Sequence, residues 1–152
     1  MEVEEWLRAN GYQNTVLKLS KIAGSAQEAA ISLNCNIGQI AKSLIFKAKN
    51  SEKALLVVTS GSNRVDEKKL EMLMGEKVER PDAEFVKAKT GFSIGGVPPV
   101  GYKETITALI DKDLFDWKEI YAAAGHPYYV FKLTPEELVK MTGGEVVEVK
   151  LK

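Results

Sequence analysis

Apolar residues along this chain gather in short runs that polar and turn-forming residues separate. The runs of strand length cover residues 15–19, 39–48, 53–60, 76–80, 105–110, 118–123, 128–133 and 145–149. Short apolar or β-branched runs bounded by turn residues predict β-strands. Uninterrupted apolar runs such as Ala54–Val58 are far shorter than the roughly 20 residues of a membrane-spanning helix, so no membrane partner is expected.

Five other segments carry the signals of helix ends. Helices are expected over residues 3–10, 26–33, 67–74, 83–89 and 135–142. Ser25 and Thr134 each stand three residues before a glutamate, which is the spacing of a capping box, and Asp66 and Asp82 are further N-caps. Glycine follows the predicted last turn, where it ends a helix, in three cases: Gly11, Gly75 and Gly143.

The order of these elements predicts the fold class. Strands and helices alternate irregularly, and the loops between several consecutive strands are too short for a parallel crossover. The sequence therefore predicts an α+β fold with a mixed, strongly curved, barrel-like sheet flanked by helices, and disfavours a doubly wound nucleotide-binding sheet. No repeat or linker divides the 152 residues, so residues 1–152 are expected to form a single domain.

The charge balance restricts the partners. Twenty-one basic and twenty-one acidic residues give a formal net charge of zero, which argues against a protein that coats nucleic acid non-specifically. Residues 39–53 are locally basic, with Lys42, Lys47, Lys49 and Lys53 against the single acid Glu52. This segment is either a solvated strand edge guarded by lysines or a local patch that binds RNA.

A single cysteine and a single histidine restrict the chemistry. Cys35 and His126 leave no intramolecular disulfide, no cysteine-based zinc site and no multi-histidine metal site. Without a Walker loop, an HExxH motif or a GxSxG motif, we expect no metal, no cofactor and no covalent intermediate. Cys35 is interpreted as a small buried residue. The acidic N-terminus lacks the basic start of a signal peptide, so a cytoplasmic location is expected.

Lys42 interrupts the apolar run IAKSLIF of residues 40–46. Alternation along a strand places Ile40, Lys42, Leu44 and Phe46 on one face. An ammonium group among large apolar side chains is costly to bury unpaired. It is either an edge lysine that reaches solvent or a lysine at the mouth of a pocket, where it meets a phosphate or a polarised carbonyl.

Two further segments are candidates for binding. Residues 91–101 (GFSIGGVPPVG) hold four glycines and two prolines, so they form either a shaped loop whose backbone N–H groups cradle a ligand or an ordinary turn-rich connection. His126 follows three alanines and a glycine, and these small residues leave room for a ligand. The alternative for a lone histidine is a structural or simply exposed side chain.

The ordered set of segments resembles the YbaK/ProX family, which includes the editing domain inserted in bacterial prolyl-tRNA synthetases. The resemblance rests on IAKSLIF (40–46), TSGSNRVDEKKL (59–70), TGFSIGGVPPVG (90–101) and the strand ending at Asp111, and it runs from about residue 23 to residue 149. The family implies a mixed sheet with helices and hydrolysis of the ester that joins a mischarged amino acid to the terminal adenosine of tRNA, typically tRNA for proline.

The resemblance also implies site residues. Lys42 falls on the family's essential lysine, Gly95 and Pro99 fall on its GxxxP loop, and His126 matches a histidine of the alanine-editing and synthetase-inserted branches. Ala123 stands where the cysteine-editing branch tends to carry a serine, and the histidine that many members carry near residues 21–24 is absent. The candidate catalytic residues are Lys42, Gly95 and His126, and the candidate substrate-binding residues are Ser43, Ser60, Gly96, Val97, Pro99, Gly101 and Ala123.

A mechanism without metal or nucleophile is expected, because an aminoacyl ester is already activated and positioning with charge stabilisation suffices. In this hypothesis Lys42 holds the terminal phosphate or ribose, backbone N–H groups near Gly95 steady the oxyanion, and the ribose hydroxyl with His126 places the water. A small pocket would admit alanine and reject proline.

The expected partners are the acceptor end of mischarged tRNA and prolyl-tRNA synthetase, for a free-standing monomer or homodimer. The alternatives are a non-catalytic module that binds tRNA or a synthetase, a deacylase for Cys-tRNA(Pro), and an unrelated small-molecule binder.

Overall fold

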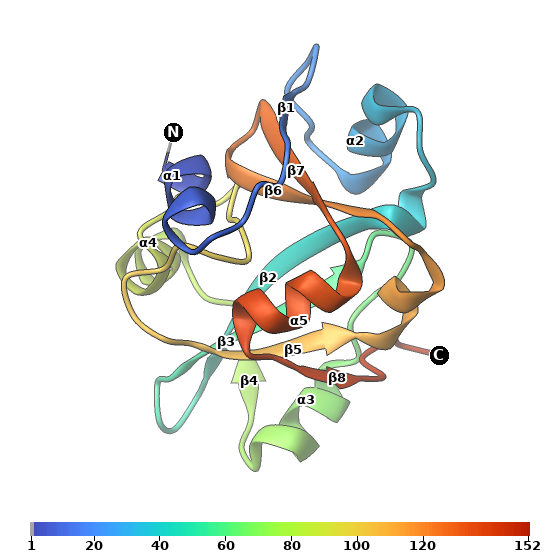
Figure 1. Cartoon of the computed structure of the whole chain (residues 1–152). Helices are drawn as coiled ribbons and strands as arrows, with labels where there is room; N and C mark the ends of the chain where they lie inside the picture. The colour runs from blue at the N-terminus through green and yellow to red at the C-terminus, as the bar shows by residue number, and fades with distance from the viewer. Residues whose placement is uncertain (1) are drawn as a thin grey trace.

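The computed structural model describes residues 2–152, which form one mixed β-sheet with helices on both faces (Figure 1). The strands are β1 (Val16–Lys18), β2 (Ile40–Ala48), β3 (Ala54–Ser60), β4 (Val78–Glu79), β5 (Thr107–Asp111), β6 (Ile120–His126), β7 (Tyr129–Leu133) and β8 (Glu145–Val147). The helices are α1 (Glu2–Ala9), α2 (Ala26–Leu33), α3 (Glu67–Met74), α4 (Ala83–Thr90) and α5 (Pro135–Thr142), with two 3₁₀ turns, η1 (Ile37–Gln39) and η2 (Lys112–Asp116).

The sheet mixes parallel and antiparallel pairs in the order β1-β7-β6-β2-β3-β5-β8. The pairs β2/β6, β3/β5 and β5/β8 are parallel, and the others are antiparallel. The predicted mixed α+β class is confirmed. The barrel-like description was too strong, because β1 and β8 end the sheet and, over residues 2–152, do not pair with each other to close it.

The long strand β2 has two partners along one edge, and this splits the sheet. Its other edge pairs with β3 from Ala41 to Lys47. On the edge away from β3, the start of β2 pairs with β6 at Ile40 and Ala41, and its end pairs with β4 at Lys47 and Ala48. Residues 42–46 have no strand partner on this second edge, so the sheet opens there at the centre of β2.

Alternate residues of β2 and β3 enter different cores. Ala41 and Ile45 join the main core, to which α1, α4 and α5 contribute Val3, Leu7, Val86 and Leu138. Phe46 of β2 packs on the opposite face of the sheet with Leu70 of α3, and Ile40 packs with Ala29 and Ala30 of α2. The period-two alternation that the sequence predicts for this strand is confirmed.

A buried carboxylate ties the end of β3 to the end of β5. Asp111 is fully buried, and its Oδ2 accepts hydrogen bonds from Thr59 Oγ1 (3.1 Å), the Ser60 N–H (2.9 Å) and Asn63 Nδ2 (2.9 Å). Ser60 in turn donates from Oγ to the Gly38 carbonyl at 2.7 Å. The segments TSGSN and Ile110-Asp111, which carry part of the sequence resemblance, therefore meet in one structural hydrogen-bond network.

The predicted helices and strands are present, and differences are confined to their ends. The caps at Ser25, Asp66, Asp82 and Thr134 all accept the expected backbone hydrogen bonds. The strand predicted over 76–80 is reduced to Val78–Glu79. The two 3₁₀ turns were not predicted, because three to five residues are too few to show a period.

Candidate functional site

The opening in the sheet beside β2 leads into a pocket of about 400 Å³. Strand β2 forms one wall, the loop of residues 91–101 and the end of β6 form others, and α2 contributes small residues. Seven of the ten candidate residues line it: Lys42, Ser43, Gly95, Gly96, Val97, Ala123 and His126. Three segments that lie far apart in the sequence thus meet at one cavity, whose size falls in the range of small-molecule sites.

Lys42 is a partly buried cation at the wall of this pocket. Within residues 2–152 its ammonium forms no ion pair, and no aspartate or glutamate lines the pocket. Burial lowers the pKa of Lys42, and the guanidinium groups of Arg80 and Arg64 lower it further. An anion bound nearby would stabilise the charged form of this lysine.

Arg80 lies on the same pocket wall as Lys42. Its guanidinium stands over the ring of Phe46, 5.4 Å from the ring centroid, and Phe46 shares a face of β2 with Lys42. The ring contact holds the guanidinium near the ammonium without neutralising either. Together the two side chains make a positive wall suited to a phosphate group.

Ser43 contributes a hydroxyl from the other face of β2. Its Oγ is buried and is the one buried side-chain polar atom, among those the structure describes, that has no hydrogen-bond partner. Leaving a hydroxyl buried and unsatisfied is unfavourable, and native proteins rarely do so without a reason. Ser43 is one of the residues that line the pocket, so a ligand bound there is a candidate for the missing partner.

The unpaired edge of β2 adds main-chain groups. The Gly61 N–H donates to the Ile40 carbonyl (2.7 Å) and the Ala48 N–H donates to the Lys53 carbonyl (2.9 Å), so the even-numbered residues of β2 bond to β3. In an antiparallel pair the intervening residues turn their N–H and C=O groups to the opposite edge. Ser43 and Ile45 therefore present backbone donors and acceptors at the pocket.

The loop of residues 91–101 closes the pocket against β6. Gly95 has φ +101°, a conformation that favours glycine, and Gly96 lies so close to β6 that a Cβ atom there would stand 3.0 Å from the His126 nitrogen. The backbone N–H groups of Gly95, Gly96 and Val97 make no hydrogen bond within the described chain. These three donors are free to bind a ligand oxygen.

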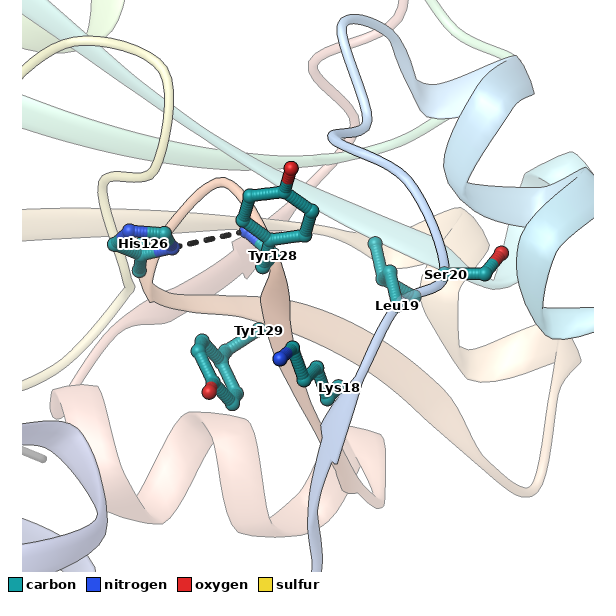
Figure 2. Close-up of a pocket in the computed structure, with 6 residues that line it drawn as sticks. All are labelled: Lys18, Leu19, Ser20, His126, Tyr128 and Tyr129. Carbon is teal, nitrogen blue, oxygen red and sulfur yellow. Dashed lines mark hydrogen bonds between the residues drawn. The ribbon is translucent and has the colours of Figure 1, made fainter.

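His126 is an exposed side chain at the pocket mouth whose ring is fixed by its neighbours. Its Nδ1 accepts a hydrogen bond from the Tyr128 N–H at 3.2 Å, as Figure 2 shows. The neutral ring therefore carries its proton on Nε2, which acts as a donor toward a ligand or a water molecule.

Three candidate residues lie outside the pocket. Ser60 belongs to the buried network around Asp111 and uses its hydroxyl to bind Gly38. Pro99 and Gly101 line a separate cavity of about 220 Å³ beside Trp6. These three residues belong to β3 and to the end of the glycine loop, and they are not among the residues that line the 400 Å³ pocket.

No sequence pattern marks Arg80 or the tyrosines beside His126 as site residues. Arg80 follows a two-residue strand and reaches the pocket because the sheet opens between β4 and β6.

Cys35 is partly buried beside α2, and burial raises the pKa of its thiol. Within residues 2–152 no three histidine, cysteine, aspartate or glutamate side chains gather as metal ligands. In the same range no helix has the length and apolar character needed to cross a bilayer.

Comparison with known proteins matches residues 21–141 to the family described as the aminoacyl-tRNA editing domain. The chain is 30% identical over 129 residues to the "Putative Cys-tRNA(Pro)/Cys-tRNA(Cys) deacylase EbsC" of Enterococcus faecalis, covering 84% of this chain and 78% of the relative. It is 33% identical over 96 residues to a proline–tRNA ligase of Limosilactobacillus fermentum, covering 60% of this chain and 17% of the ligase. A solved structure described as "a putative trans-editing enzyme for prolyl tRNA synthetase" superposes with a TM-score of 0.94 at 38% identity, covering 99% of this chain and 96% of the other.

Proposed function

The chain belongs to the aminoacyl-tRNA editing domain family and is an aminoacyl-tRNA deacylase, and we propose that it removes alanine from mischarged tRNA for proline. In this proposal it acts in trans, as a polypeptide separate from the synthetase, in the cytoplasm where charged tRNA is found. The observation that carries it is the unpaired Lys42 ammonium in a pocket that also holds three free backbone N–H groups.

Lys42 and Arg80 bind the phosphate next to the terminal adenosine. Both are cations on one wall of the pocket, and no carboxylate on that pocket competes with the ligand. Binding a phosphodiester there places one negative charge beside two positive charges that repel each other in the free protein. This anchors the ribose and its ester beside the glycine loop.

The free N–H groups of Gly95, Gly96 and Val97 face the developing negative charge. Water attacks the carbonyl carbon of the ester, the carbonyl oxygen becomes an oxyanion, and the bond to the ribose oxygen then breaks. The proton that the water loses goes to the ribose oxygen, so free amino acid and a free ribose hydroxyl are released. Main-chain donors fixed before the reaction stabilise the oxyanion without further reorganisation.

His126 orients the attacking water together with the free ribose hydroxyl. Because Nδ1 is held by the Tyr128 N–H, the Nε2–H group is the one that reaches the pocket, and it donates to the water oxygen. In this assignment His126 is a donor that positions the water and does not itself remove the proton. The Ser43 hydroxyl, which lacks a partner in the free protein, binds the amino group or the carbonyl of the substrate.

The lining of the pocket favours a small, uncharged amino acid. It includes Ala23, Ala26, Ala29, Ala41 and Ala123 together with apolar branched side chains, and it offers no carboxylate to a charged substrate. An apolar site of this kind excludes larger side chains by size and charged ones by desolvation. Cysteine is the second candidate, because the relative in Enterococcus faecalis carries Cys-tRNA(Pro) and Cys-tRNA(Cys) in its name.

The test is hydrolysis of a panel of mischarged tRNAs by the purified protein, with uncatalysed hydrolysis subtracted. We expect Ala-tRNA(Pro) to have the highest kcat/KM, Cys-tRNA(Pro) a lower one, and Pro-tRNA(Pro) to be spared. Faster hydrolysis of Cys-tRNA(Pro) would replace alanine by cysteine as the substrate. Absence of turnover with every member, at protein concentrations that bind tRNA, would mean that the chain is a binding module and would overturn the proposal.

A further inference from the structure

A second pocket, of about 750 Å³, adjoins the first at its mouth. It is lined by Lys18, Leu19, Ser20, His126, Tyr128 and Tyr129, which Figure 2 shows as sticks. His126, Tyr129 and Leu19 line both pockets. The second pocket is therefore continuous with the candidate site, and the reaction proposed above does not use the rings of its tyrosines.

Three aromatic rings gather in this pocket, and His126 contacts the two tyrosine rings, whose side chains point in opposite directions from the chain (Figure 2). We call these three residues, His126, Tyr128 and Tyr129, the aromatic shelf. The rings of His126 and Tyr128 are stacked, with centroids 5.7 Å apart and an angle of 20° between their planes. Tyr129 meets the His126 ring edge-on, at a centroid distance of 5.7 Å and an angle of 68°. The stack with His126 is the one ring contact of Tyr128 in the described chain, so the other face of Tyr128 is available to a planar group.

The strand register places a cation beside the aromatic shelf. Lys18 of β1 is directly opposite Tyr129 of β7, and Tyr129 is directly opposite His126 of β6. Residues directly opposite each other on adjacent strands have side chains on the same face, so the three form one row. Lys18 is exposed and has no ion-pair partner within residues 2–152, and no aspartate or glutamate lines this pocket.

Accessible aromatic rings with a cation that has no ion-pair partner, and no acid among the lining residues, match the chemistry of an unpaired nucleotide. Proteins bind single-stranded RNA by stacking bases on tyrosine and histidine rings while lysine meets the backbone phosphates. A purely structural aromatic cluster would be covered by other side chains, whereas these rings border an open pocket of about 750 Å³. The hydroxyl groups of Tyr128 and Tyr129 also make no hydrogen bond within the described chain.

We propose that the aromatic shelf binds the base of the nucleotide that precedes the terminal adenosine, with Lys18 beside its backbone phosphate. This assignment rests on the proposed function for the identity of the RNA, because the aminoacylated adenosine must occupy the 400 Å³ pocket. The base then stacks on the open face of Tyr128 just outside that pocket. The aromatic shelf thereby holds the single-stranded end in the direction that delivers the ester to Lys42.

The test measures equilibrium binding of a fluorescently labelled, uncharged RNA that ends in CCA, so that hydrolysis plays no part. We expect Tyr128→Ala to weaken binding about tenfold, as loss of one stacked base does, and Tyr128→Phe to bind like the unmodified protein. Lys18→Ala should weaken binding and reduce the salt dependence by about one phosphate contact. The matched control is Phe115→Ala, which removes a ring that is 40% exposed and lines neither pocket, and it should bind normally.

A second measurement identifies the base. RNA that lacks the base next to the terminal adenosine should bind the unmodified protein as weakly as intact RNA binds Tyr128→Ala, and combining the two changes should cause no further loss. Additive losses, or a Tyr128→Ala affinity within twofold of normal, would overturn the assignment. Either result leaves the proposed function standing if Ala-tRNA(Pro) is still hydrolysed, so the two proposals fail separately.

Discussion

Gly96 packs directly against the backbone of His126, so closely that a Cβ atom on Gly96 would lie 3.0 Å from the backbone nitrogen of His126 and 3.1 Å from its Cα. This contact joins the glycine loop to the end of β6, and residues 95–97 line the same pocket as Lys42. In our proposal the catalytic donors and the histidine keep their spacing because nothing larger than glycine fits at residue 96.

Gly96→Ala tests this contact. The added methyl group must push the loop away from His126, because its nearest neighbours are backbone atoms that cannot rotate aside. Displacing oxyanion donors by a few tenths of an ångström is expected to lower kcat at least tenfold, with a smaller change in KM. Ser93→Ala, an exposed position in the same loop, is the control and should keep full activity. Normal kcat in Gly96→Ala would show that the loop does not need this approach.

Ser43→Ala separates a substrate contact from a structural one. The Ser43 hydroxyl is buried without a partner, so its removal should leave the free energy of unfolding unchanged or raise it by up to about 1 kcal/mol. The same change should raise KM for Ala-tRNA(Pro) several-fold, because a hydrogen bond to the substrate is lost. Unfolding in urea and steady-state kinetics measure the two effects. A destabilised protein with unchanged KM would contradict the proposed role.

The pH dependence of activity should follow Lys42. Its pKa lies below that of an ordinary lysine because of burial and of the nearby guanidinium groups of Arg80 and Arg64. A lysine that binds phosphate as a cation loses this interaction as the pH rises through its pKa. The value of kcat/KM, which reports the ionisation of the free enzyme, should therefore fall on the alkaline side at a lower pH than an unperturbed lysine would give, after correction for uncatalysed ester hydrolysis.

Arg80→Ala should shift this fall in activity at alkaline pH to higher pH. Removing a repelling positive charge raises the pKa of Lys42, so the fall in rate should shift to higher pH, even though the overall affinity for RNA decreases. NMR titration of the Lys42 side chain measures the same pKa directly. A midpoint that stays in place or moves to lower pH would mean that Arg80 does not act on Lys42.

Asp111→Ala should be strongly destabilising. The buried carboxylate accepts hydrogen bonds from Thr59, Ser60 and Asn63, and its loss leaves several buried donors unsatisfied. We expect a decrease in the free energy of unfolding of about 3 kcal/mol or more. Asp116→Ala, an exposed aspartate nearby in η2, should change it by less than about 0.5 kcal/mol. A loss below about 1 kcal/mol for Asp111→Ala would contradict the structural role given to this network.

The helices and strands were predictable because their signals are local. Ser25, Thr134 and the glycines after the last turns fix helix ends within a few residues, and β-branched runs fix the strands. The opening of the sheet beside β2 was not predictable, because it depends on β4 and β6 pairing with opposite ends of one strand. That long-range arrangement brings Arg80 to Lys42, and no pattern near residue 80 signals it.

The candidate site, too, could be predicted only in part from the sequence. Seven residues of the sequence prediction meet at the pocket, because the resemblance carries their order and spacing. Ser60, Pro99 and Gly101 belong to equally recognisable segments, but they support the fold and do not line the pocket. Sequence patterns mark residues that a fold needs as strongly as residues that a substrate touches, and only their contacts distinguish the two.

The central claim is that the Lys42 cation anchors the substrate, and deacylation of Ala-tRNA(Pro) by Lys42→Met tests it most directly. Methionine keeps most of the side-chain volume and removes the partly buried charge, so the variant should fold and unfold like the unmodified protein in urea. Our account predicts a loss of kcat/KM of at least about 100-fold. A folded Lys42→Met protein that hydrolyses Ala-tRNA(Pro) within twofold of the normal rate would contradict it.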